Sequence, residues 1–549
     1  MKKSRLIIAI VLLGSVFGYF SCGFALQNGI AIPSLVYWFF FLMIPCMSVL
    51  LISDNENFNV LILLILSFSV YSQFFLQNQT SYPAARDTLF DMQLVSTIQR
   101  TGKWYPGMGT AMAIELSIYP LMYIFVASAS LIIGINPYQL MFIIPWLKSI
   151  VFILFFYLFT KNLLFDKRMQ IQGVFIASLI YLGCILYVGY PHPEVFSEIF
   201  FMGTLWIYTI EKKSFGKNVV FIILVFALAI SHHFTSFIFL ILISSIYLIR
   251  RGKETSSPLL PIIIVISWIM FVSWKLVEGY SIGFLNSLKL VLNFESRTIV
   301  GPVGAAISYY YTPLEFILMI ANPALVGVLA FVSFINEIKN KRKDIPLRTH
   351  ITITLVFSSL TILAVAFLFS GSEMATSAYR ILGFLYIPLS IWISLLLLRK
   401  LKNPVLLKIL MMVIVVILFA SMSLSVMYGI KKWYVPRGYM ETYRFSDSMV
   451  KTGLWSGLYL NGTIIGDNLA YNFVGSWGYK EVDSYAFVSW YITKDDKILK
   501  NFNYIILSPW DKSTYSDTFR EPIDPFAALP RDLNVIYSSE DLVMYYKSP

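Results

Sequence analysis

A polar stretch that follows a long apolar run carries two aspartates with the spacing of one helical turn. Asp87 and Asp91 lie within residues 85–107 and would share one face of a helix. Apolar residues recur between Leu89 and Ile98, which would lay that helix on a membrane surface. Two carboxylates there suit general-base catalysis or metal binding. The structural alternative is a pair of acids favoured at a helix N-terminus, with Asp87 as the cap.

A lysine inside an apolar run is the second residue that calls for a chemical explanation. Lys148 lies about ten residues into the run 139–160, near mid-depth of a predicted span. A charge at that depth is costly and faces the bundle interior, where it meets a partner. We expect that partner to be a lipid phosphate or a buried carboxylate, and snorkelling to the membrane surface is the alternative.

Two short turns between apolar runs carry the remaining histidine and glutamate candidates. His192, Glu194 and Glu198 follow one another closely, and the two glutamates are four residues apart at the end of a predicted span. They form either a solvated turn or part of a site on the outer face. His232 and His233 form either a polar turn or a pair of ligands, and adjacent histidines on a helix do not face one metal ion.

Three further charged residues are candidates for binding phosphate at the membrane surface. Arg297 lies in one long loop, and Glu373 and Arg380 flank the ends of two later apolar runs. Arginines beside a bilayer suit bidentate phosphate binding, although charges at such a rim are often only solvated. The sequence has no GxGxxG, Walker A, HExxH or kinase signature, so it gives no support for nucleotide chemistry.

The composition is that of an integral membrane protein. Of 549 residues, 58% are apolar and 13% are charged, against about 25% charged in soluble domains. The mean hydropathy is +0.72. These values exclude a disordered chain, a coiled coil and an ordinary cytosolic enzyme. The net charge of +12 comes with no Lys/Arg-rich run suited to nucleic acid, so no nucleic-acid partner is expected.

The apolar runs predict a polytopic α-helical membrane protein with about thirteen transmembrane helices. A span needs about 20 mostly apolar residues. The first run follows a short basic N-terminus and is read as an uncleaved span. The predicted spans are residues 6–26, 32–52, 59–76, 139–160, 171–190, 195–211, 217–233, 234–250, 259–278, 313–335, 350–369, 381–399 and 404–428.

The placement of positive charge predicts the orientation of these spans in the cell membrane. Residues 115–135 are apolar, but Pro120 interrupts them and leaves a run too short for a typical span. If this run does not cross, the segments predicted to be cytoplasmic hold 20 Lys and Arg residues and the outer loops hold 6. The positive-inside rule favours this arrangement, with the N-terminus cytoplasmic and the C-terminus outside. The first outer loop then covers residues 77–138 and carries surface helices.

The last part of the chain changes character. Residues 1–429 form the predicted membrane module, and residues 430–549 hold 13 Lys+Arg against 14 Asp+Glu. Short β-like runs follow a helical stretch at 439–452; they cover residues 463–465, 504–507, 535–537 and 542–546. We expect a small extracytoplasmic α/β domain.

The order of these features resembles that of the GT-C class of membrane glycosyltransferases. This class is shared with oligosaccharyltransferase catalytic subunits, protein O-mannosyltransferases and lipid A aminoarabinose transferases. The resemblance rests on an acid in the first outer loop, a basic residue in the next span, an outer-face acid two spans later, and a C-terminal outer domain. Two turns in the first outer loop, Trp104 to Gly107 and Tyr119 to Leu121, are also similar to those of this class. The chain is most similar to a largely archaeal group that carries a His-His turn like the one at Ser231 to His233.

This resemblance implies an enzyme that uses a dolichyl- or undecaprenyl-phosphate sugar at the outer membrane face. Asp87 or Asp91 would deprotonate the acceptor hydroxyl of a lipid, glycan or protein, and a single displacement would invert the sugar. Lys148, Arg297 or Arg380 would hold the departing phosphate. A divalent cation, Mg²⁺ or Mn²⁺, would have Asp87, Asp91 and Glu194 as its candidate ligands. The sequence has no WWD motif, so we do not expect sequon-reading oligosaccharyltransferase activity.

Two other functions stay open at the level of the sequence. A lipid-linked glycan polymerase or ligase would share recognition of lipid phosphate and a large outer loop. A transporter or flippase is the other alternative, although no clear internal repeat marks the chain.

Overall fold

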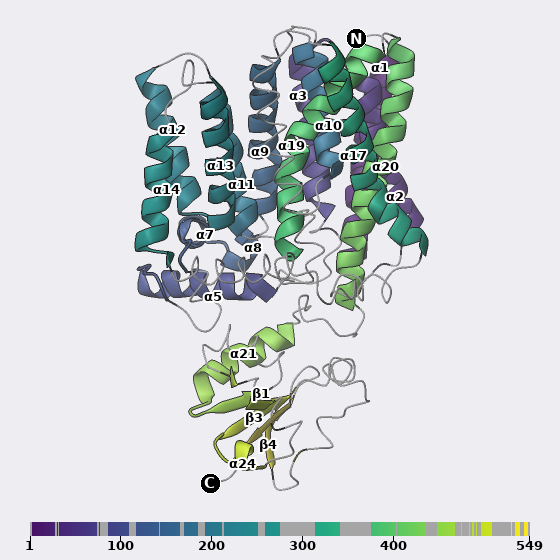
Figure 1. Ribbon diagram of the computed structural model, residues 1–549. Coiled ribbons are helices and arrows are strands. Elements are labelled where there is room, and N and C mark those ends of the chain that lie inside the picture. The colour runs from purple at the N-terminus through teal and green to yellow at the C-terminus, as the bar shows by residue number, and fades with distance from the viewer. Residues whose placement is uncertain are drawn as a thin grey trace, which may run out of the picture. The chain divides into compact units, whose positions relative to one another are not determined.

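The computed structural model describes residues 3–274, 313–340, 375–434 and 447–546, with gaps inside these ranges (Figure 1). The longer gaps are residues 77–85, 109–116, 185–192, 251–257, 467–473, 475–481 and 508–528. The chain divides into two compact units, and each is described here by itself. One holds residues 1–77, 145–189 and 194–427, and the other holds 78–144, 190–193 and 428–549.

The first unit is a bundle of apolar helices. Among the described residues, four stretches are long and apolar enough to cross a membrane, and shorter apolar helices accompany them. Its helices are α1 (Lys3–Gln27), α2 (Ser34–Leu51), α3 (Glu56–Tyr71), α9 (Ile143–Leu163), α10 (Val174–Cys184), α11 (Pro193–Thr209), α12 (Phe215–Ala229), α13 (His233–Arg250), α14 (Leu259–Phe271), α17 (Pro313–Asn340), α19 (Ala375–Lys400) and α20 (Pro404–Tyr434).

These helices occupy the ranges predicted as spans wherever the structure describes the chain. Residues 350–369 lie outside the described residues. The chain is thus a polytopic helical membrane protein, and the number and orientation of the crossings stay predictions. The predicted span 139–160 corresponds to the long apolar helical stretch Gln139–Leu163, of which α9 is the main part.

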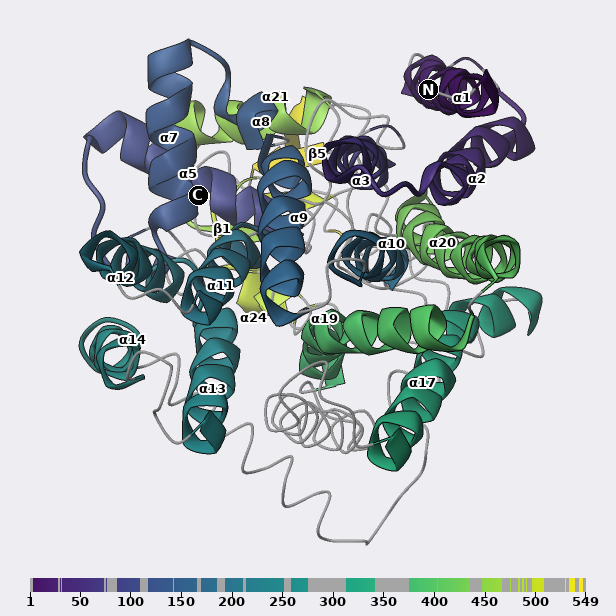
Figure 2. The same ribbon diagram turned by 90° about the horizontal axis from the view of Figure 1, so that it is seen from above.

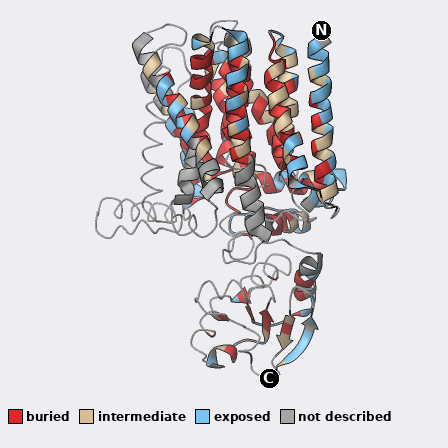
Figure 3. Ribbon diagram, turned by 90° about the vertical axis from the view of Figure 1, so that its right-hand side faces the viewer, coloured by how far each residue is buried: buried red, intermediate tan, exposed pale blue. Residues whose placement is uncertain are grey.

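Burial separates the core of the bundle from its lipid-facing surface (Figure 3). All residues of α10 are buried, and this helix packs beside α19, which also contacts α17 (Figure 2). By contrast, Phe17 on α1, Leu35 on α2 and Phe271 on α14 are largely exposed. Large apolar side chains on an outer face are what a bilayer solvates. The exposed surface therefore fits a membrane environment.

A close approach between two helices fixes the position of α10. Gly183 faces α20, where a Cβ atom would lie 2.8 Å from Cβ of Leu418 and 2.9 Å from the ring of Phe419. The backbone oxygen of Gly183 also accepts a hydrogen bond of 2.8 Å from the amide of Asn322 on α17. Only a residue without a side chain permits this approach.

The second unit contains a helical segment that lies within the predicted first outer loop. Helix α5 (Arg86–Thr101) packs against α7 (Leu121–Ile133), and the short α8 (Pro137–Met141) follows. Pro120 precedes α7, and Gly134 ends it with φ of +75°. At about 1.5 Å per residue, its 13 residues span about 20 Å, less than a hydrocarbon core of about 30 Å. This length fits the prediction that residues 115–135 do not cross.

A five-stranded mixed sheet occupies the C-terminal part of the same unit. It contains β1 (Ile464–Gly466), β2 (Val482–Asp483), β3 (Tyr504–Leu507), β4 (Asn534–Ser538) and β5 (Val543–Tyr546). The strand order is β2-β1-β3-β5-β4, and β1 runs parallel to both neighbours while β5 is antiparallel to β3 and β4.

This sheet matches four of the predicted β-like runs, and β2 is additional. Helix α21 (Asp447–Tyr459) precedes the sheet, later in the chain than the predicted stretch 439–452. Trp490 and Phe487 are buried against Ile505 in a small core that also includes residues of β1. The predicted domain boundary between residues 429 and 430 stays a prediction.

The close packing of Gly183 leads to a stability prediction. Gly183→Ala forces α10 and α20 apart, because the new Cβ meets the Cβ of Leu418 rather than the flexible end of a side chain. We expect a loss of about 1–3 kcal/mol, seen as a lower unfolding temperature of the purified protein. Gly327→Ala on α17 is the matched control, since a Cβ atom added there would have nothing within 4 Å. Equal unfolding temperatures for the two variants would contradict the packing.

Candidate functional site

A buried ion pair joins two helices of the bundle. Nζ of Lys148 on α9 lies 2.5 Å from Oε2 of Glu198 on α11. The lysine side chain is 2% exposed and the glutamate side chain 19% exposed. The sequence predicted that Lys148 would meet either a lipid phosphate or a buried carboxylate, and the structure supplies the carboxylate. Snorkelling does not occur, because the ammonium group points to α11.

Two aromatic rings surround the same ammonium group. The ring centroid of Tyr71, at the end of α3, is 5.4 Å from Nζ of Lys148, and that of Phe152 is 5.7 Å away. Both distances permit a cation–π attraction. Phe152 also stacks on Tyr181 of α10 at 5.3 Å. The charge therefore sits where α3, α9, α10 and α11 meet.

A chain of hydroxyl groups connects α11 to the histidine turn. The hydroxyl of Ser197 is 2.8 Å from that of Thr235, and it also donates to the backbone oxygen of Glu194. Thr235 is in turn 3.1 Å from Nδ1 of His232, which is buried. The rings of His232 and His233 lie 4.7 Å apart at an angle of 37°. His232 thus belongs to a packed polar network rather than to a solvated turn.

In the second unit, Asp91 is buried on α5 and bonded to α7. The hydroxyl of Tyr123 donates a 2.8 Å hydrogen bond to Oδ1 of Asp91, and neither residue is measurably exposed. Of the apolar residues predicted to recur along this helix between Leu89 and Ile98, Met92 and Val95 are also buried. A second bond, from the side chain of Gln99 to Ser130, ties the same two helices together.

The remaining candidates are placed only in part. Asp87 lies on α5 and Arg380 on α19, but the structure does not describe their side chains. His192, Arg297 and Glu373 lie outside the described residues. The roles assigned to these five residues stay predictions.

The described residues do not form a metal site. They contain no group of three or more His, Cys, Asp or Glu side chains that could hold a metal ion. Asp91, one of the predicted ligands, uses Oδ1 to accept the hydrogen bond of Tyr123. No catalytic step is therefore assigned to a metal ion, and the expected divalent cation stays a prediction.

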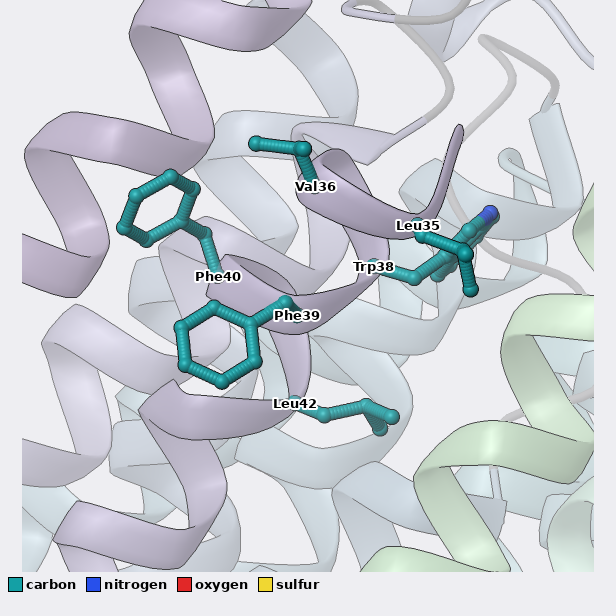
Figure 4. Close-up of a pocket in the computed structure, with 6 residues that line it drawn as sticks. All are labelled: Leu35, Val36, Trp38, Phe39, Phe40 and Leu42. Carbon is teal, nitrogen blue, oxygen red and sulfur yellow. The ribbon is translucent and has the colours of Figure 1, made fainter. Parts of the chain in front are cut away.

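A pocket on α2 is apolar throughout and supplies no reactive group. It has a volume of about 510 Å³ (Figure 4). The residues that line it are Leu35, Val36, Trp38, Phe39, Phe40 and Leu42. Such a lining offers neither an acid, nor a base, nor a phosphate ligand.

Sequence reasoning did not identify the two tyrosines of these sites. Tyr71 ends an apolar run, and Tyr123 follows the turn at residues 119–121, so both read as ordinary span or surface residues. A hydroxyl within an apolar run needs a hydrogen-bond partner when it is buried. For Tyr123 that requirement is the one signal that could have singled it out, and it does not say which partner. Tyr71 contacts Lys148 through its ring, and its hydroxyl has no hydrogen-bond partner among the described residues.

Comparisons with known proteins show the fold. No protein-family model matches the sequence, and no curated protein matches it. Among solved structures, the Archaeoglobus fulgidus oligosaccharyltransferase in complex with zinc and sulfate matches with a TM-score of 0.50 and 11% sequence identity. The match covers 88% of this chain and 73% of the oligosaccharyltransferase chain.

Two other solved structures give similar values. The archaeal oligosaccharyltransferase AglB from Archaeoglobus fulgidus, in complex with an inhibitory peptide and a dolichol-phosphate, has a TM-score of 0.50 and 11% identity, covering 85% of this chain and 72% of its own. ArnT from Cupriavidus metallidurans, bound to undecaprenyl phosphate, has a TM-score of 0.49 and 10% identity, and the match covers 88% of this chain and 97% of the ArnT chain. The similarity to the two oligosaccharyltransferase structures shows that the chain shares their fold.

The bond between Asp91 and Tyr123 leads to a prediction about α5. Tyr123→Phe removes the donor and leaves a buried carboxylate oxygen without it, which costs about 1.5–3 kcal/mol for a bond to a charged group. We expect faster backbone hydrogen exchange across α5, measured by mass spectrometry. Tyr105→Phe is the control, because Tyr105 is 56% exposed. Unchanged exchange in α5 of the Tyr123 variant would show that the bond does not hold the helix.

Proposed function

We propose that the chain is a glycosyltransferase that takes its sugar from a polyprenyl-phosphate donor at the outer face of the cell membrane. The observation that carries this proposal is the similarity, over 88% of the chain, to an archaeal oligosaccharyltransferase. A second structure of an archaeal oligosaccharyltransferase contains dolichol-phosphate. The acceptor is a hydroxyl-bearing lipid, glycan or protein.

The carboxylates of α5 have separate roles in this proposal. A general base must reach the hydroxyl that it deprotonates. Asp91 is fully buried and bonded to Tyr123, which supports a role in holding α5 in place. Asp87, one helical turn earlier, is then the base. It removes the proton as the acceptor oxygen attacks the anomeric carbon and the bond to the phosphate oxygen breaks, with inversion.

The leaving group needs a cation, because the phosphate gains negative charge as this bond breaks. Lys148 is a buried cation among the described residues of the helix bundle and is proposed to bind that phosphate. Arg297 and Arg380 are further candidates that the sequence supplies. His192, Glu194, His232, His233 and Glu373 complete the set of residues proposed to contact the substrate. Glu198 belongs to the same set as the ion-pair partner of Lys148 and not as a ligand of the phosphate.

Transfer from a polyprenyl-phosphate sugar is the direct test, and release of polyprenyl phosphate reports it whatever the acceptor is. In liposomes that contain the full chain, we expect Asp87→Asn to lower the rate by at least about 100-fold, as loss of a general base does. Asp91→Asn is expected to lower the unfolding temperature as well as the rate. Asp54→Asn is the matched control, since Asp54 is exposed and its bond to Gln172 survives as an amide pair.

Three outcomes of this assay would contradict the proposal. Full activity of both α5 variants removes the base. A ladder of products in place of a single added sugar indicates a polymerase or ligase. Uptake of substrate into vesicles without any release of polyprenyl phosphate indicates a transporter.

A further inference from the structure

We infer that Glu198 occupies the position on Lys148 that the phosphate group of a polyprenyl-phosphate lipid takes when it binds. Carboxylate and phosphate then exchange on one buried ammonium group. This inference rests on the proposed function and deepens it, because it assigns Glu198 as an internal competitor of the donor phosphate and of the phosphate product.

Two aromatic rings and one carboxylate face the ammonium group of Lys148, and the carboxylate is the one of these that an anion can replace. The ring of Tyr71 lies 5.4 Å from Nζ and the ring of Phe152 lies 5.7 Å from it, and both residues are 1% exposed. Oε2 of Glu198, 2.5 Å away, occupies a third direction. Aromatic faces attract a cation but repel an anion. Within the described residues, an incoming phosphate therefore meets the ammonium group where Glu198 now lies.

Glu198 is the movable member of the pair. Its side chain is 19% exposed, whereas that of Lys148 is 2% exposed. The carboxylate can leave by rotation about its own side-chain torsions, while the lysine is enclosed between α3 and α9. Because the side chain of Glu198 is more exposed than that of Lys148, an incoming ligand reaches the carboxylate before it reaches the ammonium group.

Electrostatics require an exchange rather than simple addition of the phosphate. Lys148 and Glu198 together have no net charge, and Glu194 lies one helical turn before Glu198. A phosphate that joined the intact pair would enter a site with a formal charge of −1. If it replaces Glu198, the ammonium group keeps an anionic partner throughout, so the bare buried charge that is so costly never forms.

The same exchange has a consequence for turnover. Glu198 returns to Lys148 when the polyprenyl phosphate product leaves, and this return favours release. Glu198 therefore weakens product binding as well as donor binding. Removal of its carboxylate is expected to lower the Michaelis constant for the donor and to slow product release.

The experiment measures binding of farnesyl phosphate to the purified full chain by isothermal titration calorimetry. We expect Glu198→Gln to lower the Kd by about tenfold, a common size for coupling between two binding events. Lys148→Met is expected to abolish binding. Farnesol, which lacks the phosphate, should bind alike to all variants. Glu56→Gln is the matched control, because Glu56 forms a 2.5 Å ion pair with Lys161 whose side chains are 37% and 35% exposed.

The outcomes separate this inference from its alternatives. A folded Glu198→Gln variant with an unchanged or higher Kd overturns the exchange and makes the pair purely structural. If that variant does not fold, Glu198→Asp withdraws the carboxylate by one methylene, and a lower Kd is again the expected result. If Glu198→Gln binds inorganic phosphate more tightly than the wild type does but not farnesyl phosphate, the assignment of a lipid phosphate as the ligand is overturned.

The failure of the proposed function would look different. It is the absence of polyprenyl phosphate release by the wild-type chain in the transfer assay, whereas failure of the exchange is an equal Kd for the wild type and Glu198→Gln. Tight binding of farnesyl phosphate that Glu198→Gln improves supports the exchange in either case.

Discussion

A charged amine inside an apolar helix bundle is stable only if an anion accompanies it. Lys148 meets this requirement with Glu198, at 2.5 Å and with almost no exposure of the amine. Removing one member of such a pair costs about 3–5 kcal/mol, because the other charge stays buried without compensation. The pair therefore fixes the register of α9 against α11, and the ring of Tyr71 brings α3 to the same point.

A second constraint acts on the segment that carries the proposed base. Helix α7 is apolar and short, its crossing of the membrane is not predicted, and it packs on α5. The hydroxyl of Tyr123 binds the carboxylate of Asp91 at the centre of that contact. Asp91 therefore serves as a structural element of α5, and the proposed base is its neighbour Asp87, one helical turn earlier.

The sequence predicted the helices well because apolar runs of span length are a local property of the chain. It also identified Lys148 as needing a partner, since a charge in such a run breaks the pattern. It did not predict that Glu198 rather than a phosphate is that partner, because pairing between α9 and α11 depends on tertiary packing. The same limit applies to Tyr123, whose run of neighbours gives no sign of Asp91. Two-residue strand β2 was missed because so short a strand is defined by its pairing with β1.

The spacing of Asp87 and Asp91 could not separate their roles, because both satisfy the same helical periodicity. Burial of Asp91 supports a structural role for that residue. The ion pair of Lys148 and Glu198 is the part of the fold to which phosphate binding is assigned in the proposal. A cryo-electron microscopy structure of the full chain with bound polyprenyl phosphate tests this account most directly. We predict that the phosphate lies within about 4 Å of Nζ of Lys148, the range of an ion pair, with Glu198 turned away. A phosphate bound elsewhere, with the Lys148–Glu198 pair intact, would contradict it.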